Sequence, residues 1–543
     1  MAGDSETPLL LETVDGVVDF KGRPVLRSTS GGWKAAAFII SVEVAERFAY
    51  YGINSNLINY LTGPLGQSTA TAAENVNIWS GTASLLPLLG AFLADSFLGR
   101  YRTILIASVI YILALSLLTL SATLPSDGES HAILFFFSLY LVAFAQGGHK
   151  PCVQAFGADQ FDINHPQERK SRSSFFNWWY FTFTAGLLVS VSILNYVQDN
   201  IGWFLGFGIP CISMVIALFL FSLGTWTYRC SIPPSDQQRP PFSRIGRVFI
   251  AAISNCRKQT TEQQEPRPSQ QFSFLNKALI ASDGSKEKGK VCSVSEVEEA
   301  KAVLRLVPIW ATSLIFAIVF SQSSTFFIKQ GVTMDRKILP TFNVPPASLQ
   351  SFISLSIVLF IPVYDRIIVP IARAFTGKPS GITMLQRIGV GMFFSVISMV
   401  VAAFVEMKRL KVARDHGLLD MPNVTIPMSI WWLIPQYVLF GVSDVFTMIG
   451  LQEFFYDQVP DELRSIGLAL YLSIFGVGSF LSSFLISAIQ KGTSKDGCDG
   501  WFASNLNRAH LDYFYALLAV LSAVELSAFW FFSKSYVYKR TST

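Results

Sequence analysis

The feature that most constrains this chain is a series of apolar segments, each long enough to cross a lipid bilayer. A transmembrane helix needs about 20 mostly apolar residues. Twelve segments meet this requirement, beginning near Trp33, Ile78, Thr103, Ala132, Trp178, Trp203, Ala302, Leu349, Leu385, Ile430, Gly467 and Tyr513. The pattern predicts an all-α polytopic membrane protein with 12 transmembrane helices.

The composition agrees with this class. Of the 543 residues, 51% are hydrophobic and only 15% are charged, whereas soluble domains are about 25% charged. The isoelectric point near 8.7 does not indicate nucleic acid, because the basic residues mostly fall between apolar segments. We therefore expect the lipid bilayer as the partner and no nucleic acid.

A polar stretch divides the twelve segments into two sets of six. The predicted plan is a cytosolic N-terminal tail (1–32), a first six-helix half (33–226), a cytosolic linker (227–301), a second six-helix half (302–534) and a cytosolic C-terminal tail (535–543). The linker contains two short amphipathic stretches, around residues 244–253 and 294–303. The fourth apolar segment ends in FGADQ (156–160) and the tenth in FFYDQ (454–458). Two related halves joined by a linker are the plan of the major facilitator fold, which places the substrate site between the halves.

Loop charge predicts the orientation, because cytosolic loops of membrane proteins are rich in Lys and Arg. The second-to-third loop, the fourth-to-fifth loop and the long linker are basic, so both termini are expected in the cytosol. The sequence EMKRLKVARDHG after the ninth segment is basic but should face outward. It precedes a glycosylation sequon at Asn423, which also requires an outward position. The polar N-terminus does not resemble a signal peptide, so the first helix should serve as the targeting signal.

Three charges lie inside the first apolar segment, in VEVAERFAYYG (42–52). At about 1.5 Å per residue, Glu43 lies roughly 15 Å into the bilayer. Glu43, Glu46 and Arg47 share one helix face, and they cannot face lipid because charge there is costly. One reading is a buried ion pair that only braces helices. The other is a proton-coupling site, because one arginine cannot neutralise two carboxylates and one carboxyl should then carry a proton.

These residues also carry a family resemblance. ExxERF at residues 43–48 resembles the motif of the proton-dependent oligopeptide transporter family. GAFLADSFLGRYRTI (90–104) and FNWWYFTFTAG (176–186) resemble further blocks of that family. GGHKPCVQAFGADQF, GITMLQRIGVG, QEFFYDQVPDELRS and NLNRAHLDYFY resemble its plant branch, the nitrate/peptide transporters. Together these blocks extend over nearly the whole chain.

The resemblance implies roles for single residues. It assigns proton coupling to Glu43, Glu46 and Arg47. It assigns substrate contact to Lys150, in GGHKP, and to Glu453, in LQEFFYDQ. On sequence alone, Lys150 could instead snorkel to the membrane surface, and Glu453 could be a hydrated helix-end carboxylate. Tyr50 and Tyr51 fit either cavity-lining phenols or ordinary interfacial or core aromatics.

The segment ADSFLGRYRT suggests conformational and regulatory roles. Asp95 and Arg100 are predicted to belong to the cytosolic loop between helices two and three that latches the halves, with Asp365 and Arg366 as the counterpart in the second half. Thr103 follows a basic residue by three positions, which suits many kinases, so a kinase is a candidate partner. The alternative for each is a plain solvated turn.

One position departs from the nitrate transporters that the chain resembles. Where their seventh helix carries a histidine toward the anion, this chain has Phe320, counted from Gln322 and Thr325. Phenylalanine cannot hydrogen-bond nitrate, although Arg47 and Lys150 remain as cations. Nitrate therefore stays the leading substrate, with di- and tripeptides or a larger organic metabolite such as a hormone or defence compound as alternatives.

The expected function is proton symport of a small anionic or zwitterionic solute by alternating access, with the proton as coupling ion and no other cofactor. A channel or a substrate-sensing receptor is the remote alternative. No metal-ligand spacing occurs among the six cysteines and five histidines, and no nucleophile–base set is apparent, so neither a metal site nor an enzyme is expected. Glu6, Leu10 and Leu11 match an acidic dileucine sorting signal, which can direct a transporter to the vacuolar membrane; the plasma membrane is the main alternative. The sequence carries no signal for an oligomeric state.

Overall fold

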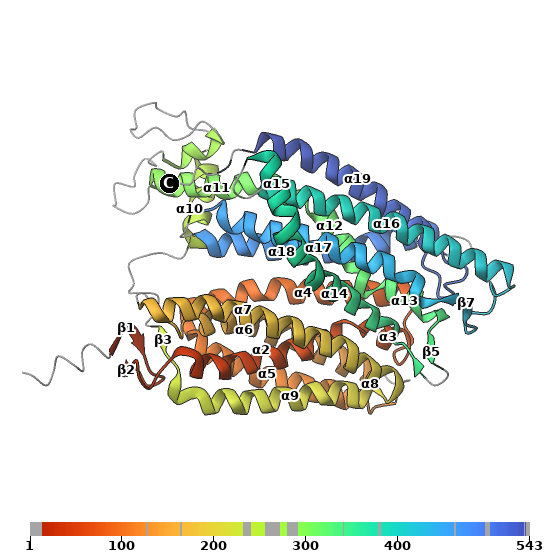
Figure 1. Ribbon diagram of the computed structural model, residues 1–543, viewed down its shortest axis with the longest axis horizontal. Coiled ribbons are helices and arrows are strands. Elements are labelled where there is room, and N and C mark those ends of the chain that lie inside the picture. The colour runs from red at the N-terminus through yellow and green to blue at the C-terminus, as the bar shows by residue number, and fades with distance from the viewer. Residues whose placement is uncertain are drawn as a thin grey trace, which may run out of the picture.

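The helices form two groups that lie one above the other in Figure 1, with the first half of the chain in the lower group. The computed structural model describes residues 13–125, 129–162, 165–231, 241–255, 272–279, 292–339, 342–377, 382–460, 463–494, 500–536 and 538. Glu6, Leu10 and Leu11 lie outside these residues. The side chains of Asp95 and Asp365 also lie outside the described part.

Each predicted apolar segment falls in a helix. The lower group contains α2 (Gly32–Asn54), α3 (Leu57–Thr62), α4 (Thr69–Leu93), α5 (Arg100–Ser121), α6 (Glu129–Ala158), α7 (Pro166–Val189), α8 (Asn195–Asn200) and α9 (Trp203–Leu223). The upper group contains α11 (Val294–Ala311), α12 (Leu314–Phe320), α13 (Phe326–Val332), α14 (Ser351–Val363), α15 (Val369–Thr376), α16 (Met384–Asp415), α17 (Ile434–Asp457), α18 (Arg464–Thr493) and α19 (Leu511–Ser535). The linker contributes α10 (Pro241–Ser254).

Length and composition identify most of these helices as membrane spans. Among the described residues, nine helices are long and apolar enough to cross a bilayer, and the bent pair Val294–Ala311 and Leu314–Val332 makes a tenth. Helices α2 and α7 fall outside this set. Helix α2 carries the Glu43, Glu46 and Arg47 charges, and α7 is rich in basic and polar residues. Both nevertheless run alongside the other spans in the lower group (Figure 1).

Several helices begin earlier than the apolar segments predict. Helix α4 begins at Thr69, where the Ser68 side chain accepts a hydrogen bond from the Thr71 amide. Helix α11 begins at Val294 behind a capping box formed by Ser293 and Glu296. Capping side chains satisfy the first backbone amides of a helix, so the helix extends into polar sequence that hydropathy does not register. The amphipathic stretches expected at 244–253 and 294–303 are both helical.

The two ends of the bundle differ. The linker end holds the starts of α2, α5, α7, α11, α16 and α18, together with α10 and a three-stranded sheet. This sheet has the order β2-β1-β3 and is built from β1 (Thr13–Val18), β2 (Pro24–Leu26) and β3 (Cys230–Ser231). The far end holds α3, α8 and four short strands: β4 (Met334–Asp335) pairs with β7 (Ile426–Ser429), and β5 (Lys337–Leu339) with β6 (Phe342–Asn343). Figure 1 shows the two ends at left and right.

A buried arginine holds the N-terminal sheet against the first half at the linker end. The Arg229 guanidinium contacts a Glu168 carboxylate oxygen at 2.7 Å and donates to the Ser30 carbonyl at 2.7 Å. Gly31 has a positive φ of 69°, and a Cβ there would lie 2.3 Å from Arg229 Nε. A side chain at position 31 would therefore collide with the arginine that anchors the segment.

The seventh span is broken, and a carboxylate from the twelfth lies at the break. The helix pair bends by 48° between α11 and α12. Glu525 of α19 is 2% exposed, and its Oε1 accepts a hydrogen bond from the Phe316 amide at 2.9 Å. The break leaves backbone amides without helical partners, and Glu525 satisfies one of them.

Candidate functional site

The charged cluster of the first span is buried near the middle of α2. Glu43, Glu46 and Arg47 are 4%, 0% and 1% exposed. Arg47 Nε lies 3.0 Å from a Glu43 oxygen and Arg47 Nη2 lies 2.5 Å from a Glu46 oxygen. The structure therefore brings together the three residues that the sequence predicts to share a face.

The ion pairs do not satisfy the polar atoms of this cluster. The contacts are short, but their angles do not make hydrogen bonds, and both Glu46 oxygens and Glu43 Oε2 are buried without a hydrogen-bond partner. Buried polar groups in folded proteins are almost always hydrogen-bonded. A cluster that only braced two helices would be expected to satisfy them, so this observation favours a site that changes partners.

Lys150 joins the same cluster from α6. It is half-buried and interacts electrostatically with Glu43, Glu46 and Arg47. Close packing of α6 against α4 sets this position: a Cβ on Gly90 would lie 2.0 Å from the Gly147 carbonyl oxygen. Lys150 thus lies inside the bundle, which is the placement expected from the family resemblance and not that of a snorkelling lysine.

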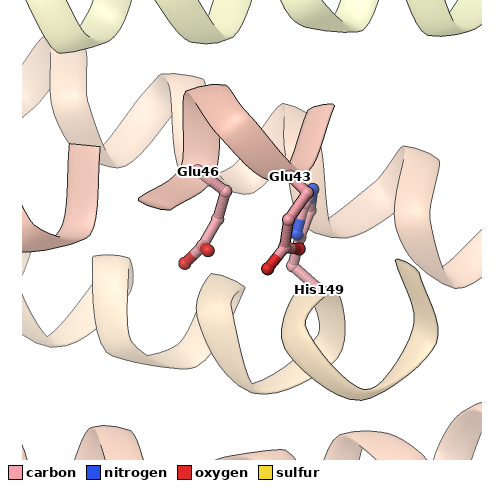
Figure 2. A group of neighbouring side chains, drawn as sticks. All are labelled: Glu43, Glu46 and His149. Atoms are coloured by element: carbon pink, nitrogen blue, oxygen red, sulfur yellow. The ribbon is translucent and has the colours of Figure 1, made fainter. Parts of the chain in front are cut away.

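The structure adds His149, which the sequence analysis did not single out. The histidine lies within α6, fully buried, and one ring nitrogen lies within 4.8 Å of one carboxylate oxygen from each of Glu43 and Glu46. Figure 2 shows its ring beside the Glu43 carboxylate. Its position next to Lys150 was the available signal, but a histidine inside an apolar helix is usually a packed core residue.

Such a donor set could in principle hold a metal ion, since His and Glu are common ligands. Here Arg47 already pairs with both carboxylates. A divalent cation would have to displace a buried guanidinium that lies beside a second cation, Lys150. The arrangement therefore suits protons better than metals.

The aromatic residues beside the cluster are packed. The Tyr50 ring stacks on Trp79 with ring centroids 5.4 Å apart. Tyr51 contacts Phe183 edge to face at 6.3 Å and interacts with Arg47. Both tyrosines interact electrostatically with Arg47 and Glu46, and Tyr50 is also packed on Trp79.

Glu453 does not join this cluster. It lies at the linker end of the second half, where its side chain is 45% exposed and 3.5 Å from Arg387. Both residues line a pocket of about 370 Å³ that also includes Tyr364 and Tyr538. Two and a half turns earlier on α17, Asp444 is 4% exposed, and its Oδ1 has no hydrogen-bond partner. Asp444, which the sequence analysis missed, is the buried carboxyl of the tenth span.

Phe320 lies in an aromatic contact within the second half. Its ring centroid is 5.8 Å from that of Phe440 and 5.4 Å from that of Phe475. Two residues on, Gln322 donates to the Ser482 hydroxyl at 3.3 Å, and Asn77 of the first half donates to the same hydroxyl at 3.0 Å. The segment containing Phe320 is therefore linked to the boundary between the halves.

The predicted latch and regulatory residues lie at the linker end. Arg100 pairs with Asp159 at 2.5 Å, within the first half. Thr103 is 6% exposed and its hydroxyl donates to the Gly99 carbonyl at 2.9 Å, so it is out of reach of a kinase in this conformation. Asn423 lies on an exposed segment at the far end, where an oligosaccharyltransferase could reach it.

Two helical halves with charged residues buried inside a membrane span are typical of secondary transporters. The sequence model of the POT family matches residues 101–502. The chain is 63% identical to "Protein NRT1/ PTR FAMILY 5.10" and 57% identical to "Protein NRT1/ PTR FAMILY 5.14", both of Arabidopsis thaliana. Each alignment covers 99% of this chain, with 98% and 99% of the relatives. The chain belongs to the POT family.

Solved structures agree with this assignment. The crystal structure of an auto inhibited POT family peptide transporter has a TM-score of 0.72 at 22% identity, covering 94% of this chain and 98% of that one. The crystal structure of the POT family transporter PepTSo has a TM-score of 0.70, covering 92% of this chain and 98% of that one. The predicted family, the major facilitator fold and the class of multi-pass membrane transporter are confirmed. A family of small-molecule transporters also fits the expectation that the chain is not an enzyme.

Proposed function

We propose that this protein is a proton-coupled symporter that carries a small anionic or zwitterionic solute, with nitrate as the leading substrate. The observation that carries the proposal is the buried cluster of Glu43, Glu46 and Arg47 beside Lys150. Charge at this depth is costly and marks transport pathways or proton relays.

Charge balance couples the proton to the anion. Two carboxylates and two cations sum to zero when all four groups are ionised. An anionic substrate that binds Lys150 or Arg47 withdraws a cation from the carboxylates, and one of these then takes up a proton. The anion and the proton therefore bind together, and the binding of either one alone is unfavourable.

Asp444 supports a second candidate substrate class. A buried carboxyl in the second half would pair with the ammonium group of a dipeptide, while Lys150 would pair with the peptide's carboxylate. Nitrate has no cation to offer Asp444. Phe320 provides an apolar surface and no hydrogen bond, which also suits an organic solute.

Alternating access fits the contacts between the halves. At the far end, Lys329 Nζ donates to Thr62 Oγ1 at 3.0 Å and Gln350 donates to the Ser55 carbonyl at 2.9 Å. We assign the linker end to the cytosol, because its loops are basic, and we assign the structure to a state whose outer side is closed. The dileucine sequence with Leu10 and Leu11 would direct the protein to the vacuolar membrane, where symport would move solute from the lumen to the cytosol. A fluorescent fusion carrying Leu10→Ala and Leu11→Ala tests this location.

The deciding experiment is uptake into vesicles that contain the purified protein. A gradient of about two pH units can drive about hundredfold accumulation of an anion moved with one proton. We expect labelled nitrate, or else labelled dialanine, to accumulate in wild-type vesicles. Glu46→Gln should only equilibrate the solute, while the linker variant Glu296→Gln should behave as wild type. Equilibration without accumulation in the wild type would indicate a channel and contradict the proposal.

A further inference from the structure

His149 lies against the proton-coupling carboxylates although it belongs to another helix. It is fully buried on α6, and one of its ring nitrogens, one Glu43 carboxylate oxygen and one Glu46 carboxylate oxygen lie within 4.8 Å of one another. Figure 2 shows all three side chains converging between α2 and α6. The tight contact of Gly90 with Gly147 fixes this part of α6.

Neither ring nitrogen of His149 has a hydrogen-bond partner. A neutral imidazole has one donor and one acceptor, and leaving both unmade in a buried site lowers stability. The other buried histidine of α6 has one partner, because His131 Nε2 is 2.9 Å from the Tyr60 hydroxyl, while His131 Nδ1 is also without a hydrogen bond. The fold therefore gives the His131 ring one hydrogen-bond partner and the His149 ring none.

The charges of the groups around His149 balance one another in the present state. Helix α2 contributes Glu43, Glu46 and Arg47. Lys150 follows on α6, and Tyr111 of α5 lies with its ring centroid 6.5 Å away. From α4 the contact at this level is made by Leu86 against Gly147, which is uncharged. With two carboxylates and two cations, the imidazole has no reason to ionise here.

We propose that His149 shares the coupling proton with Glu43 and Glu46. This inference rests on the proposed function. When an anion draws a cation away, a proton from water joins the cluster and sits between a carboxylate oxygen and an imidazole nitrogen. Either the carboxyl O–H donates to the ring or the ring N–H donates to the carboxylate, and the unpartnered nitrogen gains its hydrogen bond. The same proton leaves to water on the other side, so no other reactant is needed.

The test needs no substrate. Infrared spectra of the purified full-length protein, recorded across a pH titration, follow the stretching band of the protonated carboxyl groups. The difference between the wild type and Glu46→Gln identifies the part of this band that comes from the cluster. His149→Gln and His149→Asn place an amide near Nε2 and Nδ1 respectively. We expect at least one of them to move the midpoint of the cluster band by about one pH unit or more. The matched control His131→Gln, on the same helix, should leave the midpoint unchanged.

The proposal would be overturned if both folded His149 variants kept the wild-type midpoint of the cluster band. It would also be overturned if His131→Gln shifted this midpoint as much as the His149 variants do. Transport separates this failure from failure of the proposed function. Folded His149→Gln should exchange labelled nitrate across vesicles at equal pH but lose about tenfold or more of its gradient-driven accumulation. If wild-type vesicles show no proton-driven uptake of nitrate or dialanine, the proposed function fails, and the infrared result still decides the role of His149.

Discussion

At the scale of residues, the chain contains two buried glutamate–arginine clusters that the sequence does not distinguish. Arg409 of α16 is 0% exposed and donates to both oxygens of Glu406, at 2.6 and 2.8 Å. It also donates to Thr333, Asn507 and the Leu506 carbonyl. The Glu43, Glu46 and Arg47 cluster has similar spacing, yet three of its four carboxylate oxygens are buried without a hydrogen-bond partner. The satisfied cluster is structural, and the unsatisfied one is the candidate for function.

Removing one partner of the satisfied cluster should destabilise the protein. Arg409→Ala leaves Glu406 buried without its countercharge, and such losses cost about 3–5 kcal/mol. The exposed pair of Arg508 and Asp420 at the same end is the control, since exposed pairs contribute about 0–1 kcal/mol. Thermal unfolding of the purified variants measures the difference. Equal effects of Arg409→Ala and Arg508→Ala would show that burial of the first pair does not matter.

The same residues explain the basic sequence that disagreed with the predicted orientation. EMKRLKVARD forms the last turns of α16 at the far end. The Arg409 guanidinium is paired in its buried contacts, and Lys408 Nζ lies 3.3 Å from the centroid of the Trp432 ring. Basic side chains that are paired within the protein are weaker indicators of membrane orientation than basic side chains that are free in a loop. The far-end position of this sequence therefore agrees with the orientation that the other loops predict.

At the scale of elements, the two halves repeat each other beyond the short sequence match. The second span ends in a π-helical turn, Ala94–Leu98, and the eighth contains another, Tyr364–Ile368, between α14 and α15. An ion pair joins the third and fourth spans through Arg100 and Asp159, and a second joins the ninth and tenth through Arg387 and Glu453. The two ion pairs thus join equivalent pairs of spans, although the match of FGADQ with FFYDQ aligns Asp159 with Asp457 and not with Glu453.

Contact between α4 and α6 should depend on glycine. A Cβ on Gly90 would lie 2.0 Å from the Gly147 carbonyl oxygen, which is backbone and cannot rotate away. Gly90→Ala should therefore separate the helices, lower stability by about 1–3 kcal/mol and impair transport. Gly208→Ala in α9 is the control, because its Cβ would make an ordinary contact of 3.6 Å with Thr119. A Gly90→Ala protein as stable and active as Gly208→Ala would contradict the packing argument.

At the scale of the whole molecule, the halves are joined at the far end and along the boundary of α4 and α18. A Cβ on Gly81 would lie 3.0 Å from the Gly476 carbonyl oxygen, so these two helices are in close backbone contact. At the far end, the Ser192 and Ser351 hydroxyls lie 3.2 Å apart, and Ser348 donates to the Val191 carbonyl at 3.2 Å. A rocking motion that opens the far end must break these contacts.

A disulfide across the far end should therefore stop transport. Side-chain oxygens 3.2 Å apart indicate that Ser192→Cys and Ser351→Cys can form a bond with little movement. Oxidation should reduce uptake by about tenfold or more, because a locked protein cannot alternate, and a reducing agent should restore it. Each single cysteine variant is the control. Unchanged uptake in a fully cross-linked sample would show that the far end need not open.

The sequence by itself determined the class of fold, the two halves and the family. Apolar length is a local property, and the ExxERF cluster is local too, since one helix turn brings its charges together. The tertiary structure decided what depends on contacts between helices. It placed His149 and Lys150 against α2, showed Asp444 buried and Glu453 half-exposed, and buried Thr103. Whether a polar side chain is satisfied depends on partners from distant segments, and no spacing within one helix contains that information.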